Sequence, residues 1–223
     1  MSNLSITIHW KVDAPLHIGT GLSQSGGADR TIRVNPATGQ PEFPGDAFKG
    51  AVRGLAERLV RWLDNNPKPE PKLHSLPQYE ILRHIFACSP DAAAYRFTTP
   101  TDLTGGEITS HTGTAINPDT GSAKDHTLRI TQSWTAGARF KAVITAANGD
   151  WSRDGQDYLD LVLLYAALVA TDAAGGRKSN GHGQLEIEKV EIDGAAKEEL
   201  LSPANLATLQ QRIRADKGDY LDA

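Results

Sequence analysis

The order of apolar patterns along this chain restricts its fold more than any other feature. Apolar and polar residues alternate in several short segments, which predicts half-buried strands at 6–12, 128–130, 140–144 and 185–192. Apolar residues at helical spacing predict helices over about 46–64 and 158–169. The order strand, helix, two or more strands, helix, strand predicts an α+β fold, with a ferredoxin-like (RRM-like) antiparallel sheet and two helices.

Long loops are expected to interrupt this pattern. The chain has 223 residues, which suits a single large domain, and only 39% of them are hydrophobic while 21 are glycine. A compact core with long excursions would produce that composition. We therefore expect one ferredoxin-like domain over 1–223 with insertions at about 19–44, 65–77 and 88–127.

Smaller elements follow from local signals. Asp46 is typical of an N-cap, which places the start of the first helix there. Short helices are expected near 78–87 and 205–214, and short strands near 31–34 and 95–103. A turn at 136–137 is expected between the two middle strands. The polar segment 104–126 indicates a thumb-like excursion or a disordered insertion. No internal repeat is evident.

Charge and cysteine content exclude some classes of protein. The formal net charge of −4 excludes a uniformly basic nucleic-acid binder, although a local basic groove can still bind phosphate. Cys88 is the only cysteine, so no internal disulfide can form, and a cytoplasmic location is the simplest interpretation. The longest apolar run, at 161–170, is too short to span a bilayer, so we expect no membrane partner.

Two glycine-rich segments indicate where a ligand could bind. The first, at 16–21, contains Gly19 and Gly21, and the second contains Gly175, Gly176, Gly181 and Gly183. Glycine allows a backbone to approach a ligand closely. The side chains expected to contact phosphate or ribose there are His17, Thr20, Arg177, Lys178, Asn180 and His182. The alternatives are a flexible surface loop and, for His17, a packing role.

The start of the first long helix offers a second candidate. Its free backbone amides and positive dipole end favour an anion. Lys49 and Arg53 are four residues apart and share one face of the helix. A phosphate could therefore meet both the amides and these two cations. A solvated helix face explains the same spacing.

Common enzyme motifs are missing. Gly45 to Ala51 begins like a phosphate loop but lacks the Gly-Lys-Ser/Thr ending. The seven histidines show no metal-ligand spacing, and the aromatic signature of RNA-recognition sheets is absent.

Four segments, in this order, resemble the RAMP superfamily of CRISPR proteins. They are Leu16 to Gly21, Asn35 to Arg53, Ile116 to Ala123 with Ala136 to Phe140 downstream, and Gly175 to Gly183. The resemblance is closest to the backbone subunits of type III (Csm/Cmr-like) effector complexes, which serve in antiviral defence. It implies a ferredoxin-like core with a thumb. It also implies guide RNA, target RNA, other RAMP subunits and a large effector subunit as partners.

The resemblance also suggests roles for individual residues. Ile116 and Asn117 would lie on the thumb, with Ile116 as an apolar wedge. Asp29 is the candidate catalytic residue, because several family members cut target RNA with a metal-dependent loop aspartate. It would hold a divalent metal, Mg²⁺ by expectation, or position a ribose 2′-hydroxyl for attack. The family aspartate lies one residue further from its Ile-Arg pair, and a neutral loop acid is the alternative.

Several functions remain open on these grounds. The first is a guide-RNA-binding backbone subunit that cuts target RNA through Asp29, as an endonuclease active only in the assembled complex. The second is a non-catalytic structural subunit of that complex. A RAMP-type guide-processing endoribonuclease is the third, and a small-ligand or generic RNA-binding domain is the fourth.

Overall fold

The computed structural model describes residues 2–21, 27–64, 79–86, 94–153, 155, 157–193 and 199–216. In chain order its elements are β1 (Ser2–Val12), α1 (Gly45–Leu63), α2 (Glu80–Phe86), β2 (Tyr95–Phe97), β3 (Thr101–Thr104), β4 (Ile108–Gly113), β5 (Arg129–Trp134), β6 (Arg139–Gly149), α3 (Tyr158–Val169), the 3₁₀ turn η1 (Lys178–Asn180), β7 (Leu185–Asp193) and α4 (Pro203–Ala215). The expected segment 65–77 lies outside the described residues.

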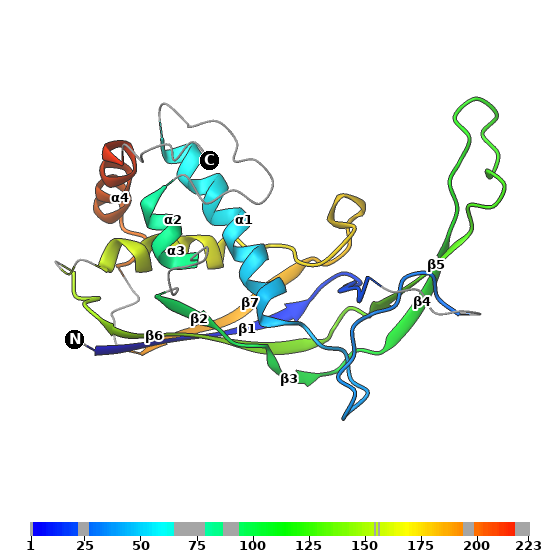
Figure 1. Ribbon diagram of the computed structural model, residues 1–223, viewed down its shortest axis with the longest axis horizontal. Helices are drawn as coiled ribbons and strands as arrows, with labels where there is room; N and C mark the ends of the chain where they lie inside the picture. The colour runs from blue at the N-terminus through cyan, green and yellow to red at the C-terminus, as the bar shows by residue number, and fades with distance from the viewer. Residues whose placement is uncertain are drawn as a thin grey trace, which may run out of the picture.

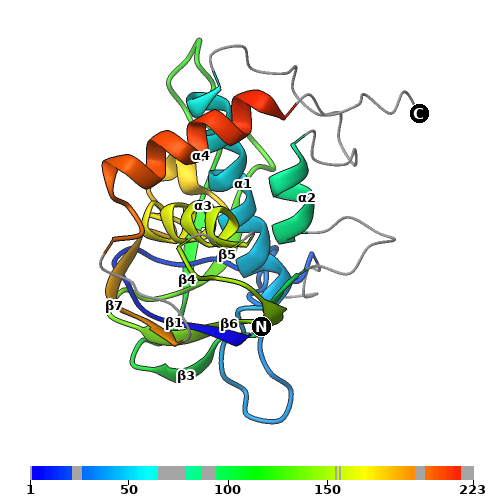
Figure 2. The ribbon, with the colours of Figure 1, turned by 90° about the vertical axis from the view of Figure 1, so that its left-hand side faces the viewer.

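The main sheet has the strand order β2-β6-β1-β7, with antiparallel neighbours, and β3 also pairs with β6. Along the chain, β1, α1, β2, β6, α3 and β7 give the β-α-β-β-α-β order of ferredoxin-like folds. The helices lie on one face of this sheet and leave the other face open (Figures 1 and 2). The α+β class is confirmed. Helices α1 and α3 match the two long helices expected, and α2 and α4 match the short helices expected near 78–87 and 205–214.

Alternation along β1 and β6 produces the core. In β1 the side chains from Leu4 to Val12 at even positions are buried, and their neighbours at odd positions face the open side. Trp10 packs edge-on against Phe48 of α1, with ring centroids 5.0 Å apart, and against Phe140 of β6 at 5.5 Å. Each such aromatic stabilises the fold by roughly 1.5 to 3 kcal/mol through burial alone.

The N-cap prediction for Asp46 is wrong. The helix begins one residue earlier, at Gly45, and Pro44 occupies the N-cap position without a side-chain hydrogen bond. The reason is tight packing, because a Cβ on Gly45 would lie 2.9 Å from the Phe97 carbonyl oxygen. Asp46 instead falls in the first turn, where its carboxylate accepts a hydrogen bond from the Ala47 N–H at 2.9 Å.

Strands β4 and β5 form a separate two-stranded sheet that projects from the body (Figure 1). We call Ile108–Trp134 the arm. Its pairing, from Ile108 opposite Trp134 to Gly113 opposite Arg129, excludes a disordered insertion over the described segment. The turn at 136–137 leads from β5 into β6 but does not make them a hairpin. Both edges of β6 are already occupied, by β1 on one side and by β2 and β3 on the other.

Parts of two predicted insertions belong to the sheet or its surroundings. Strands β2 and β3 lie inside the range 88–127, yet both pair with β6. The short strand expected at 31–34 is replaced by isolated bridges, in which Ile32 pairs with Gly19 and Val34 with Pro41. The segment at 88–93 lies outside the described residues.

One five-residue turn occurs twice. Asn35–Gly39 and Asn117–Gly121 share the sequence Asn-Pro-x-Thr-Gly. In each, the asparagine Oδ1 accepts from the N–H two residues on, at 2.8 and 2.9 Å, and its carbonyl accepts from the glycine N–H, at the same two distances. The two glycines have left-handed φ values of 68° and 66°. Each turn closes a projecting hairpin, and this repeat was missed in the sequence.

A buried carboxylate joins three of the helices. Asp160, in the first turn of α3, is fully buried and forms an ion pair with His84 of α2. Arg212 of α4 places Nη1 3.2 Å from the other carboxylate oxygen, without hydrogen-bonding geometry. His84, Asp157 and Asp160 offer ligand atoms within 4.8 Å of one another. The two cations already compensate Asp160, so we interpret the cluster as an ion pair that fixes helix positions.

This cluster predicts a pH dependence of stability. The hydrogen bond to Asp160 raises the pKa of His84 above its ordinary value of 6.5. The stabilisation is therefore complete below about pH 6.5 and is lost as the pH rises through the folded-state pKa. Urea unfolding between pH 6 and 9 should show this loss in the wild type. The His84→Gln variant should lack this part of the pH dependence, and an unchanged profile would contradict the assignment.

Candidate nucleic-acid interface

The glycines of the late loop serve close contacts within the chain. Gly175 has φ of 76°, and a Cβ there would lie 2.5 Å from the His17 carbonyl oxygen. A Cβ on Gly183 would lie 1.9 Å from the Ala174 carbonyl oxygen. Hydrogen bonds from Gly176 N–H to the His17 carbonyl, at 2.8 Å, and from Gly183 N–H to the Pro15 carbonyl, at 2.9 Å, fasten the loop. The late loop is thereby docked onto the first glycine-rich segment.

The other predicted glycines have different surroundings. Gly21 and Gly181 both have φ of 77° and open space where a Cβ would point. A Cβ on Gly19 would lie 2.8 Å from His17 Nε2, and one on Gly176 would only touch the same ring at 3.4 Å. Thus Gly21 and Gly181 are required by their backbone conformation alone.

His17 has a packing role, which was the alternative to the predicted contact with RNA. Its side chain is buried, with 7% of the residue exposed, and Nδ1 lies 2.6 Å from the Gln132 carbonyl oxygen in β5. Nearby, the hydroxyls of Thr20 and Thr31 are 2.8 Å apart on the surface. His17 therefore ties the first glycine-rich segment to the base of the arm.

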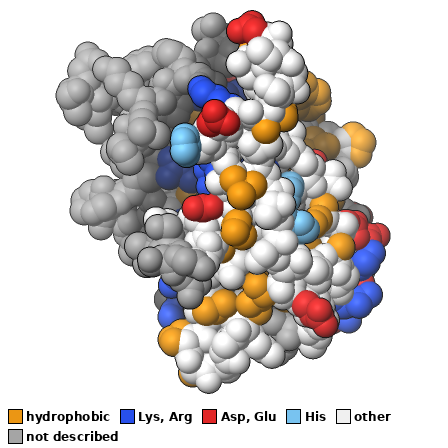
Figure 3. Space-filling model, turned by 90° about the vertical axis from the view of Figure 1, so that its right-hand side faces the viewer, with side chains coloured by type: hydrophobic (Ala, Val, Ile, Leu, Met, Phe, Trp, Pro, Cys, Tyr) orange, Lys and Arg blue, Asp and Glu red, His pale blue; other side chains and the backbone are white. Residues whose placement is uncertain are grey.

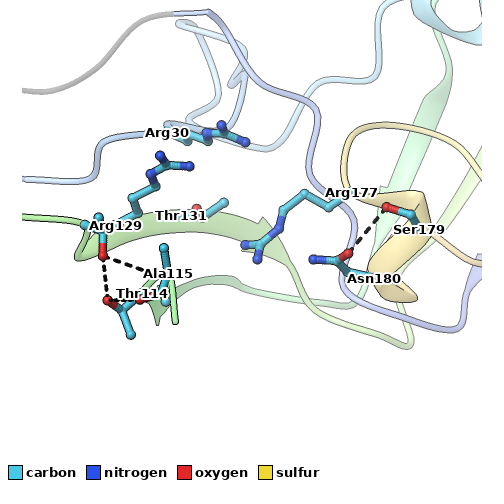
Figure 4. Close-up of a pocket in the computed structure, with 10 residues that line it drawn as sticks. Arg30, Thr114, Ala115, Arg129, Thr131, Arg177, Ser179 and Asn180 are labelled. Atoms are coloured by element: carbon cyan, nitrogen blue, oxygen red, sulfur yellow. Dashed lines mark hydrogen bonds between the residues drawn. The ribbon is translucent and has the colours of Figure 1, made fainter. Parts of the chain in front are cut away.

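A pocket of about 330 Å³ opens between the base of the arm, the segment around Arg30 and the late loop (Figure 4). We call it the arginine pocket. Arg30, Arg129 and Arg177 approach it from three separate segments of the chain. Its lining is Arg30, Gly113, Thr114, Ala115, Thr127, Arg129, Thr131, Arg177, Ser179 and Asn180.

The charge of the arginine pocket is strongly positive for an acidic protein. No Asp or Glu is among the described residues that line it, although the chain carries a formal charge of −4. On the face seen from the arm end, Lys and Arg side chains form small separate groups (Figure 3). Guanidinium groups hold phosphate with planar, bidentate hydrogen bonds. The pocket can therefore bind a polyanion even though the chain as a whole is acidic.

Backbone strain at Arg177 also supports a ligand site at the arginine pocket. Arg177 has φ of 62°, a left-handed conformation that costs a non-glycine residue roughly 1 to 2 kcal/mol. It precedes the 3₁₀ turn that presents Ser179 and Asn180 to the pocket. Strain of this kind is typical of ligand-binding positions.

The structure brings together only some of the predicted site residues. Arg177 and Asn180 line the pocket, and Lys178 lies between them in the chain, exposed to solvent. Lys49 and Arg53 do not line it, and Arg53 Nε donates to Glu57 at 2.7 Å. A role for Lys49 and Arg53 in RNA binding stays a prediction, separate from the pocket.

The amide end of α1 is less open than expected. Gly45 is buried, and its N–H donates to the Thr99 hydroxyl at 3.4 Å. Asp46 adds a negative charge in the first turn. The start of α1 therefore offers an anion less than the sequence indicated.

His182 contributes no positive charge near neutral pH. Burial, followed by the charge of Arg177, lowers the pKa of His182 below its ordinary value. Its ring lies edge-on to that of His111 in β4, with centroids 6.3 Å apart. Nδ1 of His182 is buried and has no hydrogen-bond partner in the described chain. The ring packs the late loop against the arm.

Asp29 lies at the edge of the pocket, next to Arg30. Its Oδ2 accepts a hydrogen bond from the Ile130 N–H of β5 at 2.7 Å. Arg30 runs parallel to Thr131 there, and backbone bonds join Arg30 to Ile130 and Gln132 at 3.1 and 2.9 Å. Asp29 thus helps to hold its own segment against the arm.

The surroundings of Asp29 are a poor fit for Mg²⁺. That ion requires several oxygen ligands in octahedral geometry. Within the described residues, the only group of three potential metal ligands is the cluster around Asp160, not one that includes Asp29. Three guanidinium groups near a single carboxylate also oppose a second cation. A divalent metal at Asp29 stays a prediction.

The open face of the main sheet carries paired charges. Lys11 Nζ lies 3.0 Å from Glu186 Oε2, and Arg139 Nε lies 2.8 Å from Glu188 Oε1. These exposed pairs neutralise each other across the strands, so the open face lacks the net positive charge that phosphates require. The arginine pocket is a better candidate for RNA than this face.

Of the ten residues that line the pocket, sequence reasoning singled out only Arg177 and Asn180. Arg30, Arg129 and Thr131 were not singled out, because each lies far in sequence from Arg177. Only the pairing of the Arg30 segment with β5, and the docking of the late loop, brings them together. The one signal in the sequence was the position of Arg129, a basic residue at the start of the arm strand β5.

The fold and the site define a class of protein: a ferredoxin-like sheet with a projecting arm and an arginine pocket at its base. A family model described as the RAMP superfamily matches residues 11–186. This match covers well over half of the 223 residues, and the chain belongs to the RAMP superfamily. The resemblance seen in four sequence segments is confirmed at this level.

Chains in many solved structures have a similar fold. A chain in the cryo-EM structure of the Type III-B Cmr-beta bound to cognate target RNA matches with a TM-score of 0.60 and 17% sequence identity. The match covers 86% of this chain and 61% of that chain, so this chain spans about three fifths of its neighbour's length. No curated protein matches significantly. None of the helices in the described part of the chain has both the length and the apolar run needed to cross a bilayer.

Proposed function

We propose that this chain is a guide-RNA-binding backbone subunit of a type III CRISPR effector complex, active in the cytoplasm. The observation that carries the proposal is the arginine pocket, in which three arginines converge and no Asp or Glu is among the described residues that line it. The RAMP family match and the likeness to a Cmr chain support the assignment. In this proposal the pocket holds RNA phosphates, so affinity is governed by charge and not by guide sequence.

The arm supplies a surface for further partners. Ile116 is 59% exposed, and the hydrogen bond from Asp119 N–H to the Asn117 side chain stabilises the turn beside it. In the proposed complex this tip is the thumb and contacts the guide–target duplex. Other RAMP subunits and a large effector subunit would complete the assembly.

Sequencing of RNA that copurifies with the chain tests this proposal. We expect short CRISPR-derived guides of mixed sequence, retained at low salt and lost at high salt. A monomer without RNA would contradict the proposal. Cleavage of precursor repeats by the purified chain alone, without metal, would instead identify a guide-processing ribonuclease.

Cleavage of target RNA is a second candidate function, favoured by the position of Asp29 beside Arg30. The Asp29 carboxylate could accept the proton of a ribose 2′-hydroxyl. The 2′-oxygen would then form a bond to the adjacent phosphorus as the bond from phosphorus to the 5′-oxygen breaks. That 5′-oxygen would take up a proton, and pocket arginines would stabilise the charge on the phosphoryl oxygens.

The Asp29→Asn variant separates the two functions. We expect its RNA affinity to stay within about twofold of wild type, because an amide oxygen can still accept from the Ile130 N–H. Target cleavage by the assembled complex should fall by roughly 10²-fold or more, the usual contribution of a general base. Cleavage assays on complexes reconstituted with the wild-type chain and with the Asp29→Asn variant measure this loss of cleavage. Unchanged cleavage would leave the structural subunit as the function.

A further inference from the structure

The arginine pocket contains more than phosphate ligands. Its volume of about 330 Å³ reaches the range of small-molecule sites, roughly 300 to 1,000 Å³, so it can hold more than one phosphate group. Beside the three arginines, its lining includes four hydroxyl groups and one amide, from Thr114, Thr127, Thr131, Ser179 and Asn180. Uncharged donors and acceptors next to a phosphate site are suited to a neutral polar group of the same ligand.

Thr131 is the first of two side chains available for such a group. It lies in β5 with only 3% of the residue exposed, yet it lines the pocket. No hydrogen bond joins its hydroxyl to any residue that the structure describes. By contrast, the Thr114 and Thr127 hydroxyls bond to each other at 2.8 Å. A hydroxyl that lines the pocket and makes no bond to the described chain is available to a ligand, as donor or as acceptor.

Asn180 is the second side chain that is available to a neutral polar group of the ligand. Its Oδ1 accepts from the Ser179 hydroxyl at 3.4 Å, which orients the amide. The amide nitrogen then faces the side of the pocket that holds the Arg177 guanidinium (Figure 4). Asn180 is exposed, and its NH₂ group makes no hydrogen bond within the described chain. It can donate to an oxygen adjacent to a phosphate bound by Arg177.

We propose that the arginine pocket recognises the ribose 2′-hydroxyl next to a bound phosphate, and that Thr131 and Asn180 are the residues that discriminate RNA from DNA. The 2′-hydroxyl is both a donor and an acceptor, and it is the group that distinguishes the two nucleic acids. The Thr131 hydroxyl matches it in either role, and the Asn180 amide donates to it. This inference rests on the proposed RNA-binding function and adds the basis of its sugar specificity.

The test compares an oligouridine with its 2′-deoxy counterpart, by fluorescence anisotropy on the full chain. Wild type should prefer RNA by about tenfold or more, because each of two hydrogen bonds is worth roughly threefold to tenfold. Thr131→Val and Asn180→Ala should each lower RNA affinity by about that single-bond factor and leave DNA affinity unchanged. Arg177→Gly, which suits the left-handed backbone, should weaken both ligands equally.

Thr208→Val is the matched control. It removes the hydroxyl of an exposed threonine in α4 that does not line the pocket and is bonded to the Ala204 carbonyl oxygen at 3.0 Å, so the preference for RNA should not change. Thr131→Val keeps the β-branched shape, and equal unfolding midpoints would show that the fold is intact. Equal affinity for both sugars in wild type, or an undiminished RNA preference in both variants, would overturn the inference and leave RNA binding standing. If wild type binds neither ligand, the proposed function itself fails.

Discussion

Replacing Arg30, Arg129 and Arg177 together with glutamine is expected to lower RNA affinity about 10² to 10³-fold at low salt. A hydrogen bond to a charged group contributes roughly 1.5 to 3 kcal/mol, which is about tenfold or more for each arginine. The three side chains share one pocket, so their effects will not simply add. The fold should persist, because none of the three belongs to the hydrophobic core.

Salt dependence gives an independent measure of the same effect. Each phosphate neutralised on a single strand contributes about 0.7 to the slope of log affinity against log salt. The triple variant should therefore lose about two units of slope. Arg58, Arg96 and Arg214, changed to glutamine, make a control of equal charge, since all three are exposed and none lines the pocket. Equal losses in both variants would show that only net charge matters.

The fold followed from the sequence because alternation and helical spacing act locally. Residues 6–12 and 158–169 carry complete patterns, and the structure extends or matches them as β1 and α3. The start of α1 did not follow, since Gly45 is fixed by packing against Phe97, which lies 52 residues further along the chain. The partner of β5 depended on which edges of β6 remained open, which no local pattern contains.

The site could be predicted only in part, because local patterns do not contain long-range contacts. The late loop could be identified from its glycine and basic residues, and Arg177 and Asn180 do line the pocket. Arg30 has no local signal, and the only signal for Arg129 is its position at the start of β5, because the role of both depends on long-range contacts. The repeated Asn-Pro-x-Thr-Gly turn was visible in the sequence, but five residues separated by more than eighty are a weak signal of repetition.

Gly183→Ala is expected to destabilise the protein by about 3 to 5 kcal/mol and to remove most of the RNA affinity. Its φ of 72° alone costs an alanine roughly 1 to 2 kcal/mol. In addition, the new Cβ would lie 1.9 Å from the Ala174 carbonyl oxygen, so the loop must move. That movement breaks the bonds from Gly183 N–H to Pro15 and from Ala174 N–H to Gly183, each worth about 1 kcal/mol.

Gly181→Ala is the control that isolates the clash. Gly181 has φ of 77°, as left-handed as Gly183, but open space surrounds the position of its Cβ. Its substitution should cost only about 1 to 2 kcal/mol and leave RNA binding nearly intact. Urea unfolding and anisotropy on the two variants measure both effects. If both variants were destabilised equally, Gly183 would be required only for its left-handed backbone conformation and not for the docking of the late loop. Arg177 would then reach the pocket without that docking.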